Sequence, residues 1–240
     1  MASKLININN QSYNIVYDIV NISAKKTIVF LHGWGSNKEV MKQSFKNELK
    51  EYKHIYIDMP GFGKSINEDY ILTTHEYANI IKEFLNTLNI SADIIAGHSF
   101  GGKVATLLNP PLLVLLSSAG IIEDKSAKTL LTIRMAKIFN KFGLGKVTKM
   151  LRSKDVNMMS QNMYETFKNV VDEDFSEVFK SYNGKALLFW GKKDTATTLK
   201  SGEIMHNLIK DSKFYAYDDD HYFFMKYHQD IASIIIKYNI

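Results

Sequence analysis

The sequence predicts an α/β fold, built on one mostly parallel twisted sheet with helices on both faces. Six short runs of β-branched and large apolar residues recur along the chain, and such runs suit strands that are buried on both faces. Amphipathic helical patterns fill most of the gaps between them. This alternation is typical of parallel strands connected by helices. With 240 residues, of which 45% are apolar, the chain is expected to form one sizeable core.

The expected elements follow in order from the amino terminus. Segments 4–9 and 12–18 flank Asn10-Gln11 and predict a hairpin. Thr73 and Glu76 have the spacing of a capping box, which predicts a helix that begins directly after Thr73. The six buried strands are expected at 27–31, 54–58, 93–97, 112–117, 186–190 and 213–216, and the main helices at 37–50, 74–88, 199–209 and 229–238.

One segment interrupts this alternation. Between residues 121 and 183 the pattern is amphipathic and helical, so residues 122–182 are predicted to form a helical insertion in a core made of 1–121 and 183–240. Residues 122–160 carry nine basic and three acidic side chains, a net charge of +6, whereas the rest of the chain sums to about −1. Such a charge would attract an anionic substrate or partner; a solvated helical face is the alternative interpretation.

Composition excludes several classes of function. The chain has no cysteine, so it has no disulfides and no thiolate metal site, and its histidines lack the paired spacing of a metal centre. We expect no metal and no cofactor. The basic residues are not interleaved with aromatic residues, so nucleic acid is not an expected partner. No run is long or apolar enough for a signal peptide or a membrane span, and a cytoplasmic location is expected.

The stretch "IIAGHSFGG" at residues 94–102 joins a predicted strand to a predicted helix. A strand that enters a helix through G-x-S-x-G forces the serine, here Ser99, into a tight and strained turn that exposes its hydroxyl. The backbone N–H of Phe100 then lies at the helix start, directed at any oxygen bound beside Ser99. This predicts a nucleophile with an oxyanion donor next to it.

Three further candidates follow other predicted strands. Trp34, in "HGWG", offers a second backbone N–H; Asp194 follows the strand at 186–190 and His221 the strand at 213–216. Parallel strands end at one edge of a sheet, where such folds bind ligands. A serine needs a base to remove its proton, and a carboxylate keeps the imidazole in the correct tautomer. We therefore expect Ser99, His221 and Asp194 to act as nucleophile, base and acid.

These motifs together resemble the α/β-hydrolase superfamily. "FLHGWGSN", "IDMPGFGKS", "IIAGHSFGG", "LLFWGKKD" and the late histidine match its series in order over almost the whole chain. The sequence is similar to small microbial carboxylesterases and to hydrolases of ring-fission products. The resemblance implies the same three catalytic residues, an oxyanion hole from the N–H groups of Trp34 and Phe100, and a lid over the insertion. Substrate contacts are predicted at Gly33, Met135, Ile138 and Met159.

The expected reaction is hydrolysis of a small-molecule carboxylic ester or a related carbonyl compound, anionic or bearing an acyl chain, through an acyl-enzyme. Two alternatives remain open: cleavage of a carbon–carbon bond in a 2-hydroxy-6-oxo-dienoate, and a hydrolase-fold protein that binds a ligand without turnover. Three aspartates precede His221 where the family usually has a glycine, and Asp124 is a second candidate for the acid.

Overall fold

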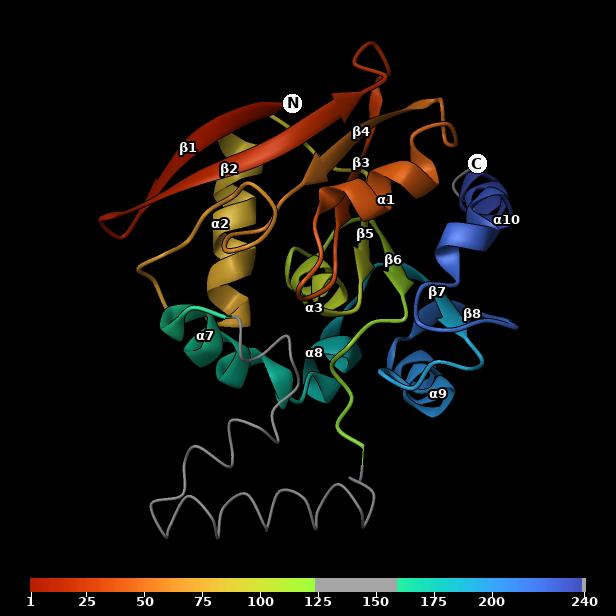
Figure 1. The fold of residues 1–240 in the computed structure, drawn as a ribbon. Helices are drawn as coiled ribbons and strands as arrows, with labels where there is room; N and C mark the ends of the chain where they lie inside the picture. The colour runs from red at the N-terminus through yellow and green to blue at the C-terminus, as the bar shows by residue number, and fades with distance from the viewer. Residues whose placement is uncertain (124–158, 239–240) are drawn as a thin grey trace, which may run out of the picture.

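The computed structural model describes residues 1–123 and 159–238, which form the predicted α/β fold around one eight-stranded sheet (Figure 1). The strand order is β1-β2-β4-β3-β5-β6-β7-β8. β1 and β2 pair antiparallel, as do β2 and β4, and every other neighbouring pair is parallel. The strands are β1 (Ala2–Ile8), β2 (Gln11–Val20), β3 (Lys26–Leu31), β4 (Tyr52–Ile57), β5 (Ile94–His98), β6 (Leu112–Leu116), β7 (Lys185–Gly191) and β8 (Asp211–Tyr217).

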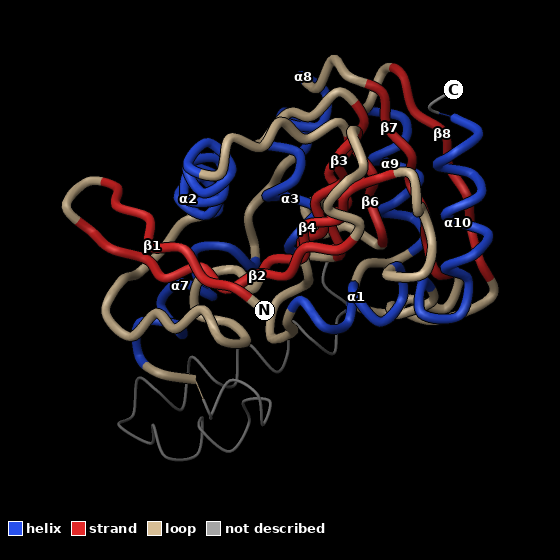
Figure 2. The backbone as a smooth tube through the Cα atoms, turned by 90° about the horizontal axis from the view of Figure 1, so that it is seen from above, coloured by secondary structure: helices blue, strands red, loops and turns tan. Residues whose placement is uncertain are grey.

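Helices cover both faces of the sheet, as Figure 2 shows from above. On one face α1 packs against α10, and on the other α2 packs against α3, with α8 and α9 continuing that layer. The described helices are α1 (Lys38–Phe45), α2 (Thr74–Thr87), α3 (Phe100–Leu107), α7 (Gln161–Val171), α8 (Ser176–Ser181), α9 (Leu199–Leu208) and α10 (Phe224–Tyr238).

The central strands are apolar along their whole length because both of their faces are buried. All five residues of β6 are buried, and alternate residues belong to different cores: Leu113 packs into the core beneath α2 and α3, and Val114 into the core beneath α1 and α10. The predicted capping box is also present, with Thr73 and Glu76 each bonded to the other's backbone N–H before α2. Fold class and this helix start were therefore predictable from the residues alone.

Three predicted boundaries were wrong. The hairpin turn consists of Asn9 and Asn10, both with positive φ, rather than Asn10-Gln11. The helix expected at 37–50 is shorter and ends at Phe45, and Leu49, within the expected range, takes a positive φ that a helix does not contain. The last helix begins five residues before the expected start, with non-helical dihedral angles at Tyr227 inside it.

Between β6 and β7 the described part of the chain contains the helices α7 and α8 and no strand. Asp124, Met135 and Ile138 lie outside the described residues. In the two described ranges, no helix is both long and apolar enough to cross a membrane.

Hydrogen bonds fix α7 to the loop that precedes α2. The Asn162 side chain donates to the carbonyl oxygen of Asn67 (2.9 Å), and the Thr166 hydroxyl accepts from the backbone N–H of Leu72 (3.0 Å). At the carboxyl end of α7, the buried ammonium of Lys103 on α3 donates to the carbonyl oxygen of Val170 at 2.7 Å. One face of α7 is thereby held at the carboxyl edge of the sheet.

Candidate active site

Ser99 occupies a strained turn between β5 and α3. Its φ of 51° and ψ of −116° are unfavourable for a residue with a Cβ atom. The turn closes tightly: a Cβ added to Gly97 would lie 2.3 Å from the carbonyl oxygen of Gly101, so only glycine fits at position 97. The side chain of Ser99 is partly exposed and makes no hydrogen bond with any described residue.

His221 and Asp194 are brought together from two neighbouring strand ends. β7 and β8 pair in parallel up to Gly191 and Tyr217, and the loops after them carry the carboxylate and the imidazole. Nδ1 of His221 lies 2.6 Å from Oδ2 of Asp194, which is a short, charge-assisted hydrogen bond. Because a carboxylate can only accept, Nδ1 carries the proton and Nε2 is left as an acceptor.

Backbone groups hold the Asp194 carboxylate in place. Its Oδ1 accepts from the N–H groups of Ala196 (2.8 Å) and Thr197 (3.0 Å), while Oδ2 faces His221. Burial raises the pKa of this carboxyl, but the hydrogen bonds from His221 and Thr197 outweigh burial and lower it from 3.8 to about 2. Asp194 is therefore an anion at neutral pH, aligned on the imidazole.

Thr197 was not expected from the sequence. Its hydroxyl lies 3.0 Å from both the carbonyl oxygen of Ser117 and Oδ2 of Asp194, and 3.4 Å from Nδ1 of His221. It thus links the ends of β6 and β7 beside the carboxylate. The sequence holds no signal for this role, since it depends on how two loops meet.

The three aspartates before His221 bond other groups; Asp219 accepts from the backbone N–H of Asp220 at 2.9 Å. Asp218 pairs with Lys193 at 3.0 Å, and Asp220 accepts from the backbone N–H of Tyr222 at 2.8 Å. The carboxylate hydrogen-bonded to the imidazole is Asp194.

His32 fixes the loop that carries the Trp34 amide. The N–H of Met59 donates to Nε2 of His32 at 3.1 Å, so the proton is on Nδ1, which donates to the carbonyl oxygen of Gly33 at 2.8 Å. Full burial lowers the pKa of His32 to about 4, which keeps the ring neutral. Since C=O and N–H of one peptide unit point in opposite directions, anchoring this carbonyl directs the N–H of Trp34 the other way.

His98 connects the serine turn to the histidine loop. Its Nε2 lies 3.1 Å from the carbonyl oxygen of His221, and the two rings are 4.5 Å apart. Burial lowers the pKa of His98 to about 3, so the neutral ring donates through Nε2. Gly33 packs from the other side, where an added Cβ would lie 3.1 Å from Cβ of Ser99. The His98 ring therefore lies between Gly33, which packs near its Nδ1, and the carbonyl oxygen of His221 at its Nε2.

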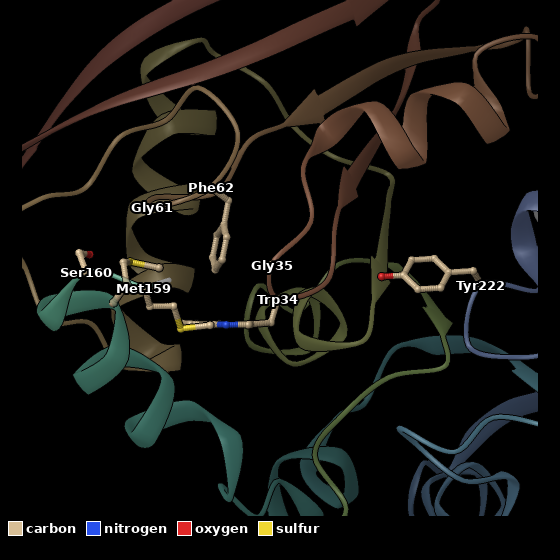
Figure 3. A pocket seen from close by; sticks show the side chains of 8 residues that line it. Trp34, Gly35, Gly61, Phe62, Met159, Ser160 and Tyr222 are labelled. Atoms are coloured by element: carbon tan, nitrogen blue, oxygen red, sulfur yellow. The ribbon is translucent and has the colours of Figure 1, made fainter. Parts of the chain in front are cut away.

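A cavity of about 600 Å³ opens beside this site (Figure 3). Trp34 follows Gly33 and Tyr222 follows His221 in the chain, and both line the cavity, where Figure 3 shows them facing each other. Ser99, His221 and Gly33 do not themselves line the cavity, whereas the predicted contact residue Met159 does. Among the described residues, those that line it are Trp34, Gly35, Gly61, Phe62, Met159, Ser160, Met163 and Tyr222.

Comparison with known proteins identifies the class. The model of the alpha/beta hydrolase family matches residues 28–225, and the chain belongs to this family. An uncharacterized hydrolase, YugF, from Bacillus subtilis is 25% identical over 234 residues, covering 85% of each chain.

Solved structures share the same fold. An esterase from Exiguobacterium antarcticum superposes with a TM-score of 0.77 at 20% identity, covering 99% of both chains. A meta-cleavage product hydrolase from Pseudomonas fluorescens IP01 superposes with a TM-score of 0.71 at 17% identity, covering 98% of this chain and 96% of the other. These likenesses concern the fold.

Proposed function

We propose that this chain is a serine hydrolase that cleaves a carboxylic ester through an acyl-enzyme intermediate. Ser99 is the nucleophile, His221 the general base and Asp194 the carboxylate that orients the imidazole. The N–H groups of Trp34 and Phe100 form the oxyanion hole.

The observation that carries this proposal is the 2.6 Å pairing of His221 with the buried Asp194 carboxylate at the sheet edge where Ser99 sits in its strained turn. A buried carboxylate oriented by two backbone N–H groups has a specific use: it keeps Nε2 of the imidazole free to accept a proton. The hydroxyl of a free serine often aligns with its base only when substrate is bound.

The reaction follows from these positions. Oγ of Ser99 attacks the ester carbonyl carbon while Nε2 of His221 takes the hydroxyl proton, and the carbonyl oxygen becomes an oxyanion held by the two N–H groups. The tetrahedral intermediate then breaks its bond to the alcohol oxygen, which receives the proton from His221. Water attacks the acyl-enzyme in the same way and releases the acid and free Ser99.

The described part of the cavity lining, which is neutral, supports an ester over the anionic dienoate of the carbon–carbon alternative. Among its described lining residues none is charged, so they offer no ion pair to a substrate carboxylate. A protein that only binds ligands would have no need for a strained serine, since backbone strain costs about 1–3 kcal/mol.

We also propose that the insertion at 122–182 forms a lid over this edge. Its described helix α7 supplies Met163 to the cavity wall and is anchored to the core by Asn162 and Thr166. A cover of this kind excludes water from the acyl-enzyme until hydrolysis.

The test is turnover of p-nitrophenyl esters of graded chain length, measured beside a 2-hydroxy-6-oxo-dienoate. We expect ester hydrolysis with higher kcat/KM than dienoate cleavage, and a loss of about 10⁴-fold or more in kcat for Ser99→Ala. Ser91→Ala, an exposed serine before β5 at the opposite edge, serves as the matched control. Faster dienoate cleavage, or a Ser99→Ala variant with full activity, would refute the proposal.

A further inference from the structure

The cavity beside the serine turn has two chemically different ends. Figure 3 shows Tyr222 on one side, with its hydroxyl directed toward Trp34, and Met159 of the insertion on the far side. The Tyr222 end has a free hydroxyl group. The far end has aromatic rings, thioethers and the hydroxyl of Ser160, which already donates to Oδ1 of Asn162 at 2.6 Å. An ester that fills this cavity therefore meets a free hydroxyl at one end and, at the other, a mainly apolar wall whose one hydroxyl, that of Ser160, is already bonded.

The position of Tyr222 is fixed by its surroundings. Its backbone N–H donates to Asp220 at 2.8 Å, and its ring packs 5.0 Å from the ring of His98 and edge-on to His221 at 5.5 Å. The side chain is 41% exposed, and its hydroxyl makes no hydrogen bond with a described residue. The hydroxyl is thus free to bond a ligand and is held at a defined distance from the imidazole.

Chemistry then assigns the two parts of the ester. His221 must return its proton to the alcohol oxygen as the tetrahedral intermediate collapses, so the alcohol part leaves on the His221 side. Tyr222 is the next residue in the chain and stands on that side of the cavity. The acyl part must extend the other way, past Trp34.

The far end is suited to an acyl chain. The rings of Trp34 and Phe62, both in the cavity lining, pack 4.8 Å apart, and Phe167 of α7, which is outside the lining, packs 5.4 Å from Trp34. Met163 closes this end: it is 7% exposed and packs so closely on Gly61 that an added Cβ there would lie 2.4 Å from its sulfur. Flexible thioethers pack well against unbranched chains of different length.

We propose that Tyr222 is a specificity-determining residue whose hydroxyl donates to a second oxygen in the alcohol part of the ester, while Met159 and Met163 limit the acyl chain. The preferred substrates are esters of an apolar acid with an alcohol that carries a hydroxyl or ether oxygen. This assignment rests on the ester hydrolysis proposed above.

The first experiment compares two esters of equal size, 2-hydroxyethyl hexanoate and propyl hexanoate, with the wild type and Tyr222→Phe. The wild type should prefer the hydroxyethyl ester in kcat/KM, and Tyr222→Phe should reduce that preference about fivefold, the effect of one average hydrogen bond. The ratio of kcat/KM for the two esters is compared between the wild type and Tyr222→Phe, so the intrinsic reactivity of each ester cancels. Tyr238→Phe, whose hydroxyl bonds Asp211 at the amino end of β8, should leave the preference unchanged.

The second experiment measures the chain-length profile with p-nitrophenyl esters from acetate to decanoate. Met163→Ala should shift the optimum to longer acyl chains without changing the alcohol preference, because it enlarges only the far end. If this buried substitution prevents folding, the partly exposed Met159 gives a second variant, Met159→Ala, with the same expected shift.

The outcomes separate the two proposals. If the wild type hydrolyses neither ester, the proposed function fails and the assignment fails with it. If it hydrolyses both but Tyr222→Phe leaves their ratio unchanged, only the assignment of Tyr222 is wrong. If Tyr222→Phe moves the acyl-length optimum and neither methionine variant does, the ester binds in the opposite direction.

Discussion

Replacing Asp194 with asparagine removes one charge from the candidate site with almost no change in shape. The N–H groups of Ala196 and Thr197 both donate to Oδ1, so the asparagine must keep its carbonyl oxygen there. Its NH₂ group then occupies the position of Oδ2, 2.6 Å from Nδ1 of His221. Because an amide N–H donates, Nδ1 becomes the acceptor and the imidazole proton moves to Nε2.

An imidazole with its proton on Nε2 cannot accept the proton of Ser99. The same substitution in the Ser-His-Asp triad of a serine protease lowers kcat about 10⁴-fold. We expect a similar loss here, about 5 kcal/mol of transition-state stabilisation. The assay is kcat for p-nitrophenyl butyrate, with the thermal midpoint of unfolding as a check that the fold is intact.

Asp218→Asn provides the control for this experiment. Asp218 belongs to the acidic run before His221, but it is paired with Lys193 and is 69% exposed. The kcat of Asp218→Asn should therefore stay within about twofold of the wild type. If Asp194→Asn keeps more than a tenth of the activity, the acid is elsewhere. Asp124→Asn then tests the second candidate.

Three further predictions concern stability. The pKa of Asp194 is about 2 in the folded state, below its usual 3.8. The ionised carboxylate therefore adds about 2 kcal/mol to the free energy of unfolding above pH 4, and this stabilisation is lost as the pH falls toward 2. Urea titrations give the free energies of unfolding of the wild type and of Asp194→Asn. The difference between them should shrink by about 2 kcal/mol from pH 5 to pH 2. A difference that stays constant with pH would contradict the pairing of Asp194 with His221. Lys103→Met should lower the free energy of unfolding in urea by about 2–3 kcal/mol. The carbonyl oxygen of Val170 and the carboxylate of Glu173 then lose their bonds to the buried ammonium. An unchanged midpoint would show that Lys103 does not anchor α7. Gly97→Ala should lower the free energy of unfolding by at least about 3 kcal/mol, because the added methyl meets the backbone of Gly101 and Gly102. A decrease below about 1 kcal/mol in the same titration would show that the turn relaxes around the methyl group.

The parts of the fold that were predictable are those controlled by local pattern. The apolar strand β6 and the capping box at Thr73 each depend on residues that are close together in the sequence, so both can be recognised there. The alternation of such strands with helices then predicts the fold class. The hairpin turn was misplaced by one residue because both Asn9 and Asn10 tolerate positive φ, and register decides between the alternatives.

Candidate site residues that follow strands were predictable, whereas those whose contacts form between separate loops were not. Ser99, Asp194 and His221 stand directly after strands, so the parallel sheet alone predicted that they gather at one edge. Thr197 and Tyr222 were missed because their contacts arise where separate loops meet. The prediction of Gly33 as a substrate contact stays a prediction, since this residue packs against Ser99 and does not line the cavity.

Covalent labelling with a fluorophosphonate, which traps an activated serine, tests the assignment of Ser99 as the nucleophile most directly. We expect one adduct per chain by intact mass, located on Ser99 by peptide mapping, and no adduct on a folded Ser99→Ala variant. Labelling of another residue, or undiminished labelling of Ser99→Ala, would contradict it.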